Sequence, residues 1–273
     1  MSPVFYSQFK NRLQQEPVVF QDENGEKTDL YGLWNCIESA DIDGDGDLDF
    51  ILGNQGKNTR LTASPAEPLT LYTGDYDNNG SPDPLVGMYY PDRSGTRRLY
   101  PLHARDDVVK QLARVKSRYR TYADFGNATF KEILAEADPS AFVEVTTLQS
   151  VWLENIGRNT FTVHPLPAAA QLAPINAILA DDFDNDGYTD LLLTGNDYGA
   201  ESNGGRADAF NGLHLRGDGK GNFVLVPLFA SGFFVPGDGR GLIMLRDKDG
   251  KQLILAGQNG GELVGFEVGK SGG

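Results

Sequence analysis

A nine-residue aspartate pattern occurs three times in the sequence and constrains the fold more than any other feature. The pattern reads D-x-D-x-[DN]-G-x-x-D and occupies residues 41–49, 75–83 and 182–190. Carboxylates at positions 1, 3 and 5 of a tight loop converge on one point, and the glycine at position 6 allows the chain to turn sharply. Each copy therefore predicts a loop that binds a hard cation between two secondary-structure elements.

The candidate ligands are the residues at the odd positions of each loop. Position 7 contributes its backbone carbonyl and the other positions contribute side-chain oxygens, which supply most of the 6–8 oxygens that calcium takes at about 2.3–2.6 Å. Magnesium prefers fewer ligands in a stricter geometry, so we expect about three calcium ions. The predicted ligands are Asp41, Asp43, Asp45, Asp47, Asp49, Asp75, Asp77, Asn79, Ser81, Asp83, Asp182, Asp184, Asp186, Tyr188 and Asp190. The alternative is a set of Asp/Asn/Gly turns without metal, in which unneutralised carboxylates repel one another.

The net charge of the chain comes almost entirely from these loops. The sequence has 24 Lys and Arg against 38 Asp and Glu, a formal net charge of −14, and thirteen aspartates lie in or directly beside the loops. An acidic chain disfavours nucleic acid and anionic lipid as partners, because both bind through clustered cations. No apolar run approaches the ~18 residues that span a bilayer, and the first residues lack the regions of a signal peptide. We therefore expect a soluble chain or a mature fragment without a transmembrane segment.

Apolar segments follow each loop and predict strands. A helix-flanked EF-hand has a bidentate glutamate at position 12, whereas this chain has Leu52, Val86 and Leu193 there. The segments after the loops are short, apolar and rich in glycine near their ends, as expected of buried strands. They cover residues 50–54, 84–87 and 191–196. The repeated unit is thus a strand, a metal loop and a second strand.

A fourth unit at residues 242–259 is degenerate. It keeps two apolar segments and two aspartates, but Leu253 replaces the last aspartate of the pattern. Lys248 and Lys251 add positive charge to its turn. We expect a similar hairpin that does not hold calcium.

These residues resemble the FG-GAP/VCBS repeat family, which forms β-propellers in integrin alpha chains and in many bacterial surface proteins. Residues 33–54 are similar to the inner strand, calcium loop and second strand of one blade, and residues 213–223 to the outer hairpin of a later blade. The resemblance extends over about residues 33–265 and implies calcium ligands at the loop positions named above.

A complete propeller of this family usually has seven blades, whereas the repeats here supply four or five. The resemblance therefore implies an all-β fold, a β-propeller or partial propeller of about four to five blades. We expect a single domain over residues 1–273, or the C-terminal part of one. An open ring leaves unpaired strand edges, so the rest of a larger chain is a further candidate partner.

Residues 104–139 interrupt the β pattern and predict a helical insertion. The apolar residues Val108, Leu112, Val115 and Tyr119 recur at helical spacing after an acidic start, and a second helix is expected over 129–137. The insertion also carries a cluster of basic residues, which is either a solvated helix face or an anion-binding face. They are Arg105, Lys110, Arg114, Lys116, Arg118 and Arg120.

A ligand is expected at the loops that follow the second strand of a unit, because these open on the opposite side from the metal loops. Aromatic faces next to hydrogen-bonding groups suit sugars or peptides, and the alternative is ordinary loop packing. The candidate ligand-binding residues are Tyr89, Tyr90, Asn196, Tyr198, Glu201, Arg206 and Asp208.

The sequence contains no recognisable catalytic constellation. His103, His164 and His214 lie far apart, and no nucleophile motif occurs. The first hypothesis is a non-catalytic, calcium-binding propeller module that binds protein or glycan. Loops without the bidentate glutamate fill at about 10⁻⁴–10⁻³ M calcium, which indicates an extracellular, cell-surface or periplasmic location. The alternatives are a polysaccharide lyase or hydrolase with its catalytic groups in the long loops, and a purely structural part of a larger surface protein.

Overall fold

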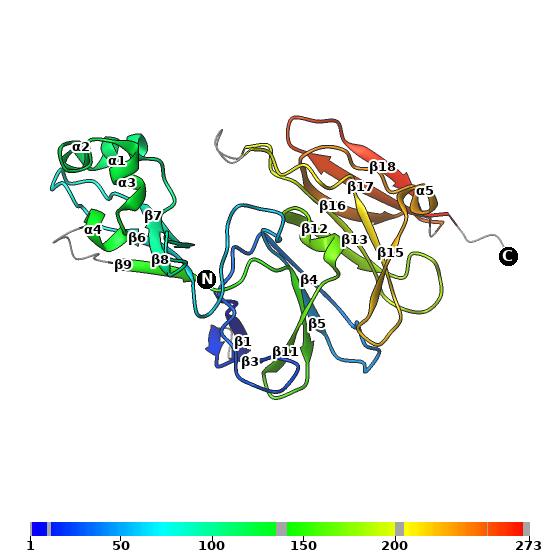
Figure 1. The fold of residues 1–273 in the computed structure, drawn as a ribbon. Helices are drawn as coiled ribbons and strands as arrows, with labels where there is room; N and C mark the ends of the chain where they lie inside the picture. The colour runs from blue at the N-terminus through cyan, green and yellow to red at the C-terminus, as the bar shows by residue number, and fades with distance from the viewer. Residues whose placement is uncertain (1, 10–11, 135–140, 200–204, 250, 270–273) are drawn as a thin grey trace. The chain divides into compact units, whose positions relative to one another are not determined.

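The computed structural model describes residues 2–9, 12–134, 141–199, 205–249 and 251–269. Contacts within the chain define two compact units (Figure 1). The insert unit is Leu61–Thr147, and the main unit combines Ser2–Arg60 with Leu148–Gly273. The chain is mostly β, as the sequence predicts, and its strands form several separate sheets. The expectation of a single domain stays a prediction.

The main unit contains three sheets and an N-terminal hairpin. The hairpin pairs β1 (Phe5–Phe9) with β2 (Arg12–Glu16). The first sheet has the order β3 (Val19–Gln21), β11 (Thr160–Pro165), β10 (Val151–Asn155), β5 (Asp49–Gly53) and β4 (Cys36–Ala40). The second sheet is β12 (Ile175–Asp181), β13 (Asp190–Gly195), β14 (Leu213–Gly217) and β15 (Phe223–Val226). The third sheet is β16 (Gly239–Arg246), β17 (Gln252–Gln258) and β18 (Val264–Glu267). Two short helices, η1 (Ala168–Gln171) and α5 (Leu228–Ser231), connect these elements.

One edge strand of each sheet lies at the centre of the main unit, because β12 packs beside both β4 and β16. Strand neighbours follow the chain order in the second and third sheets, and all their pairs are antiparallel. The first sheet differs, since β5 pairs with β10 only after the whole insert unit has intervened. The short strand β3 joins this sheet in parallel to β11.

The main core lies between the first and second sheets. Strand β13 is buried along its whole length, as its continuous apolar run predicts. Ile51 on one sheet and Leu191 and Leu193 on the other are fully buried in one cluster. Trp152 joins the same cluster. Burial of these side chains contributes roughly 1.5–3 kcal/mol each before the entropic cost of ordering.

The insert unit combines one sheet with the predicted helical insertion. Its sheet has the order β8 (Arg97–Pro101), β7 (Leu85–Pro91), β6 (Leu69–Thr73) and β9 (Ala141–Val145). Its helices are α1 (Arg105–Gln111), α2 (Ala113–Arg118), α3 (Tyr122–Asn127) and α4 (Phe130–Leu134). All four residues of the predicted apolar stripe are buried. The helix is nevertheless broken at Leu112, whose backbone angles of −123° and 85° end α1.

The other helices depart from the sequence expectation in detail. The helix expected over residues 129–137 is α4, which ends at Leu134, and residues 135–140 lie outside the described ranges. Helix α3 was not expected, although Thr121 and Asp124 form a capping box that marks its start. No helix in the described ranges is both long enough and apolar enough to cross a membrane.

Part of the basic cluster serves to hold the insertion together. The Arg114 guanidinium donates to the carbonyls of Tyr76 and Leu134 at 3.0 Å each. Arg105 donates to the carbonyl of Tyr119 at 2.8 Å. These contacts favour a structural role for both arginines over a free anion-binding face.

Candidate metal sites and ligand cavity

All three aspartate loops connect adjacent antiparallel strands, namely β4 to β5, β6 to β7 and β12 to β13. Positions 4 and 6 have positive φ in each loop. The angles are 82° and 94° at Gly44 and Gly46, 59° and 86° at Asn78 and Gly80, and 61° and 91° at Asn185 and Gly187. Glycine and asparagine adopt this conformation more readily than other residues. Position 4 is therefore part of the motif, and its Gly/Asn restriction is the signal that the sequence analysis overlooked.

The same pattern of backbone hydrogen bonds recurs within each of the three loops. The position-1 carboxylates of Asp41, Asp75 and Asp182 accept from the backbone N–H of the position-6 glycine at 3.0, 2.9 and 2.9 Å. The position-9 carboxylates of Asp49, Asp83 and Asp190 accept from the backbone N–H of position 2 at 3.0, 3.0 and 3.2 Å. The second bond closes the base of the loop over the following strand. Each carboxylate is therefore oriented by the backbone.

Three aspartate oxygens converge in each loop. The groups are Asp41, Asp43 and Asp45, then Asp75, Asp77 and Asp83, then Asp182, Asp184 and Asp190, and the oxygens of each group lie within 4.8 Å of one another. Two oxygens on opposite sides of a calcium ion lie about 4.6–5.2 Å apart, given the usual calcium–oxygen distance. One ion can therefore contact all three carboxylates of a group, and the oxygen-only donor set fits a hard cation.

The remaining predicted ligands lie in the loops but outside these groups. Asp49 is buried and accepts from Ile42 and from Asn155. Asp47 and Ser81 hold position 7, and their N–H groups donate to the side chain at position 5. The Asn79 amide donates to Asp77. Asp186 accepts from the N–H of Tyr188 at 3.0 Å, and the Tyr188 side chain is exposed.

Without a cation, the carboxylates of the first and third loops are held in an unfavourable environment. Burial raises the pKa of Asp49 to about 6, against hydrogen bonds from Asn155 and Ile42 that lower it. Burial followed by the neighbouring carboxylates also raises the pKa of Asp43, Asp47 and Asp184. A bound cation would relieve both costs.

Removing divalent cations is expected to make the main unit less stable as the pH rises from about 4 to 7. The raised pKa of Asp49 means that the folded chain holds this proton more tightly than the unfolded chain does. Its contribution is complete below the ordinary pKa of 3.8 and is lost as the pH rises through about 6. After a discount for solvent screening, a shift of this size corresponds to about 1–3 kcal/mol. Thermal melts in EDTA measure this contribution as the difference in melting temperature between wild type and Asp49→Asn. The melting temperature of Asp49→Asn should rise relative to that of wild type as the pH rises. Parallel pH profiles for the two proteins would contradict this.

The first and third sites differ in the residue that faces them from the next strand. Asn155 and Gly217 donate equivalent N–H bonds to Asp49 and Asp190 at 2.8 and 2.9 Å, so Glu154 and Arg216 occupy matching positions. Glu154 adds negative charge beside the first loop, where it helps to raise the pKa of Asp43, and its carboxylate lies 2.8 Å from Nε2 of His164. Sequence reasoning missed both residues, because they enter only through strand pairing.

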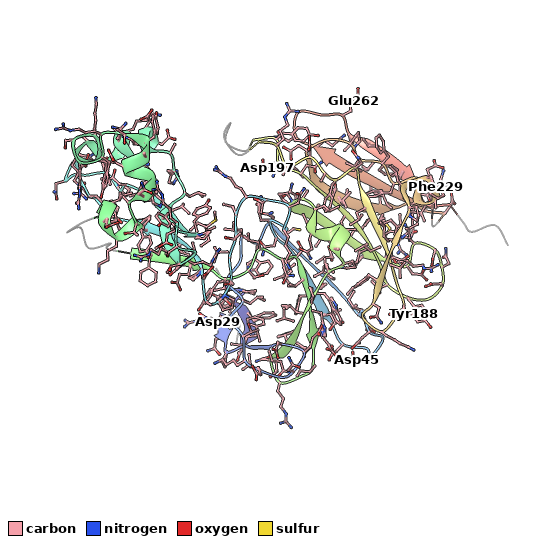
Figure 2. All side chains as sticks on the ribbon, in the orientation of Figure 1. Asp29, Asp45, Tyr188, Asp197, Phe229 and Glu262 are labelled. Carbon is pink, nitrogen blue, oxygen red and sulfur yellow. The ribbon has the colours of Figure 1, made fainter. Side chains whose placement is uncertain are left out.

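The first and third loops lie next to each other. The Thr189 hydroxyl donates to the carbonyl of Asp41 at 2.8 Å, and Figure 2 shows Asp45 and Tyr188 on the same side of the main unit. Two candidate cation sites therefore share one rim of this unit.

The degenerate unit forms the expected hairpin between β16 and β17. Oδ1 of Asp247 accepts from the N–H groups of Asp249 and Lys251 at 2.8 Å each. Asp22, Asp92 and Asp218 accept from the second and fourth following residues in the same way. This aspartate turn motif was not recognised from the sequence. The expected lack of calcium at the degenerate unit stays a prediction.

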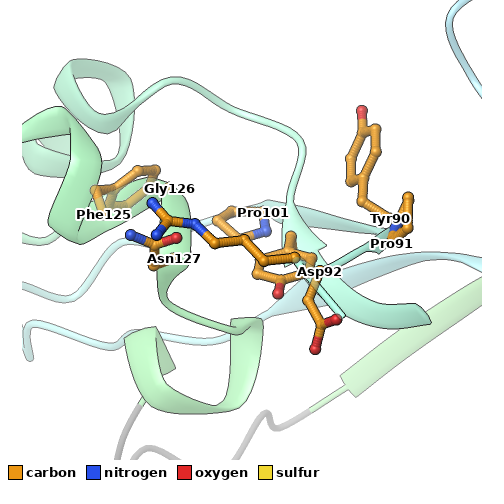
Figure 3. A pocket seen from close by; sticks show the side chains of 9 residues that line it. Tyr90, Pro91, Asp92, Pro101, Phe125, Gly126 and Asn127 are labelled. Carbon is orange, nitrogen blue, oxygen red and sulfur yellow. The ribbon is translucent and has the colours of Figure 1, made fainter. Parts of the chain in front are cut away.

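A cavity of about 380 Å³ in the insert unit is lined by Tyr90, one of the candidate ligand-binding residues. Figure 3 shows Tyr90 and Pro91 from β7, Pro101 from β8, and Phe125 and Asn127 from α3 around this space. Aromatic rings, proline rings and an amide thus meet at one opening. Tyr89, by contrast, is half-buried beside it on the strand.

The other candidate ligand-binding residues belong to the loop after β13. Asn196 is buried, and its amide donates to the carbonyls of Phe210 and Gly237 at 2.7 and 2.9 Å. The Arg206 guanidinium lies 4.8 Å from the centre of the Tyr198 ring. Asp208 is exposed, and Glu201 lies outside the described residues. The structure thus pairs Tyr198 with Arg206 but uses Asn196 to hold the loop.

Comparisons of this chain with protein-family models, with curated proteins and with solved structures give no match.

Proposed function

We propose that the chain is a non-catalytic, calcium-binding module of the FG-GAP/VCBS propeller type, which binds a protein or carbohydrate ligand outside the cytoplasm. The observation that carries this proposal is the convergence of three carboxylates in each of three loops that share one backbone network. A chance cluster of surface acids would not repeat the same backbone hydrogen bonds to the carboxylates at positions 1 and 9.

The donor set supports calcium in preference to other ions. All the converging atoms are carboxylate oxygens, which suit calcium, magnesium or manganese rather than thiophilic metals. The loops are hairpin turns with further oxygens at position 7, and such irregular sites favour calcium over magnesium, which demands a near-octahedral shell. Weak sites of this kind fill where calcium is abundant, which supports a location outside the cytoplasm.

The arrangement of the sheets supports the propeller part of the proposal. In a propeller, each blade is an antiparallel sheet whose first strand lies nearest the central axis. The edge strand β12 packs beside the edge strands β4 and β16 at the centre of the main unit, and each of the three pairs with the strand that follows it directly in the chain. The insert unit repeats the strand, loop and strand unit between β6 and β7.

The cavity at Tyr90 is the proposed place for the ligand. Its rim combines an aromatic face that is 39% exposed with the Asn127 amide, and such a combination suits a sugar ring or a proline-containing peptide. The Asp92 carboxylate at the same opening is already bound to Ser94 and Arg98. Arg93 also lines this opening, so binding there is expected to combine stacking with a contact to its guanidinium.

Replacing Tyr90 with alanine is expected to lower ligand binding at least tenfold, because the stacking face is lost. Glycan and peptide arrays probed with the full chain in millimolar calcium provide the measurement. Tyr122→Ala is the matched control, since Tyr122 belongs to the same unit, is 65% exposed and lies outside the cavity. Equal binding by wild type and Tyr90→Ala, or no binding on either array, would contradict the proposal.

A further inference from the structure

A second and larger cavity lies inside the main unit, between the second and third sheets. Its volume is about 610 Å³, which is within the range of small-molecule sites. Its apolar walls are Leu192, Val226, Phe233, Ile254, Phe266 and Val268. Helix α5 and the strand β18 border it and lie beside each other in Figure 1.

The cavity between the second and third sheets lies at the place that Trp152 fills between the first and second sheets. Trp152 on β10 pairs with Ile51 on β5, and His214 on β14 pairs with Leu192 on β13, so the two residues hold matching places in their sheets. The Trp152 ring is buried and reaches the next sheet, where a Cβ on Gly221 would lie 2.4 Å from it. His214 has a smaller side chain than tryptophan at the matching place, and it lines the cavity.

The polar side of the cavity has one positive charge without an ion-pair partner among the described residues. Arg216 lies two residues from His214 on β14, so both side chains are on the same face. Glu267 also lines the cavity but is paired with Lys251 at 2.6 Å, and Asp184 belongs to the third metal site. The Arg216 guanidinium has no ion-pair or hydrogen-bond partner within the part of the chain that the structure describes.

His214 provides a second unused polar group. Its side chain is 12% exposed, and Nε2 lies 3.6 Å from Oδ2 of Asp190, beyond hydrogen-bond distance. This nitrogen is buried and has no hydrogen-bond partner among the described residues. The His214 ring therefore lies between the cavity and the third metal site, and its Nε2 atom remains able to form a hydrogen bond.

We propose that this cavity binds a small apolar carboxylate. The hydrocarbon body would lie between the walls at Phe233 and Phe266, and the carboxylate would accept from the Arg216 guanidinium. A fork of N–H donors matches a carboxylate in geometry and charge. The cavity and its arginine do not depend on calcium. Only the neutralisation of Asp184, which would strengthen binding, rests on the proposed cation at the third site.

The test is a calorimetric titration of the full chain with 4-phenylbutyrate in millimolar calcium, alongside 4-phenylbutanol and 4-phenylbutylamine. We expect one phenylbutyrate per chain, alcohol binding that is at least tenfold weaker, and no binding of the amine. Arg216→Gln should weaken phenylbutyrate binding about tenfold or more, since a hydrogen bond to a charged group contributes about 1.5–3 kcal/mol. Arg158→Gln, at an exposed hairpin outside the cavity, is the matched control and should bind as wild type does.

His214→Trp gives the second sheet the tryptophan that the first sheet has at Trp152. This variant should abolish binding because the larger side chain fills the cavity. Arg216→Gln changes an exposed side chain and keeps the test available if the tryptophan variant does not fold. Equal affinity in Arg216→Gln and wild type, equal affinity for the acid and the alcohol, or no binding of phenylbutyrate at millimolar concentration would overturn the inference. Repeating the titration in EDTA, with bound calcium measured on the same sample, separates its failure from that of the metal proposal.

Discussion

Calcium at about 10 mM is expected to raise the melting temperature of the EDTA-treated chain by roughly 10 °C. A ligand that binds only the folded state stabilises it by RT ln(1 + [L]/Kd). With dissociation constants of about 10⁻⁴–10⁻³ M, this term is about 1.4–2.7 kcal/mol for each site. Each kcal/mol of added stability shifts the melting temperature by about 2–8 °C, depending on the size of the unit that unfolds.

The two units offer an internal comparison in the same melt. The main unit holds two of the oxygen clusters and the insert unit holds one, so each unit should respond to calcium. Magnesium at the same concentration should produce a smaller shift, because it tolerates irregular oxygen sites poorly. A melting curve that is the same in excess EDTA and in calcium would contradict this expectation.

Asp190→Ala is expected to destabilise the main unit by roughly 3 kcal/mol even in EDTA. The Asp190 side chain is buried and accepts from the N–H groups of Phe183 and Gly217 at 3.2 and 2.9 Å. Alanine would leave these two donors unpaired, and each unsatisfied buried group costs about 1–3 kcal/mol. Removing an isolated buried carboxylate offsets part of that cost. In calcium the loss should be larger, since a converging ligand of the third site also disappears.

Urea denaturation of Asp190→Ala and of Asp186→Ala measures this effect with a matched control. Asp186 belongs to the same loop, but it is exposed and lies outside the converging group. Its replacement should cost less than about 1 kcal/mol in EDTA, as surface substitutions usually do. Asp190→Asn retains one acceptor and should fall between the two. The expectation fails if Asp190→Ala unfolds at the same urea concentration as Asp186→Ala.

The local structure of the loops was predictable because it depends on neighbouring residues. The spacing of the aspartates, the glycine at position 6 and the apolar flanks together specify a strand, a loop and a strand, and all three copies adopt it. Asn78 and Asn185 could have been recognised as left-handed residues from their match with Gly44. Burial of the helical stripe around Val108 and Val115 was likewise visible in its spacing.

Features that depend on distant pairing were not predictable. Nothing in the sequence near β5 indicates that its partner β10 lies beyond the insert unit. Pairing between strands that are far apart in the chain has no local sequence signal. The break at Leu112 reflects packing of α1 and α2 in the core of the insert unit rather than a local helix breaker. Glu154, His214 and Arg216 became candidates only when the register placed them beside the loops.

Equilibrium dialysis against ⁴⁵Ca, at concentrations up to about 10 mM, tests the central claim most directly, since it counts the ions that the aspartate groups hold. The account predicts three calcium ions per chain at saturation. It also predicts one fewer in each of Asp43→Ala, Asp77→Ala and Asp184→Ala, whose carboxylates belong to different groups. No bound calcium at about 10 mM, or the same number of bound ions in the wild type and all three variants, would contradict it.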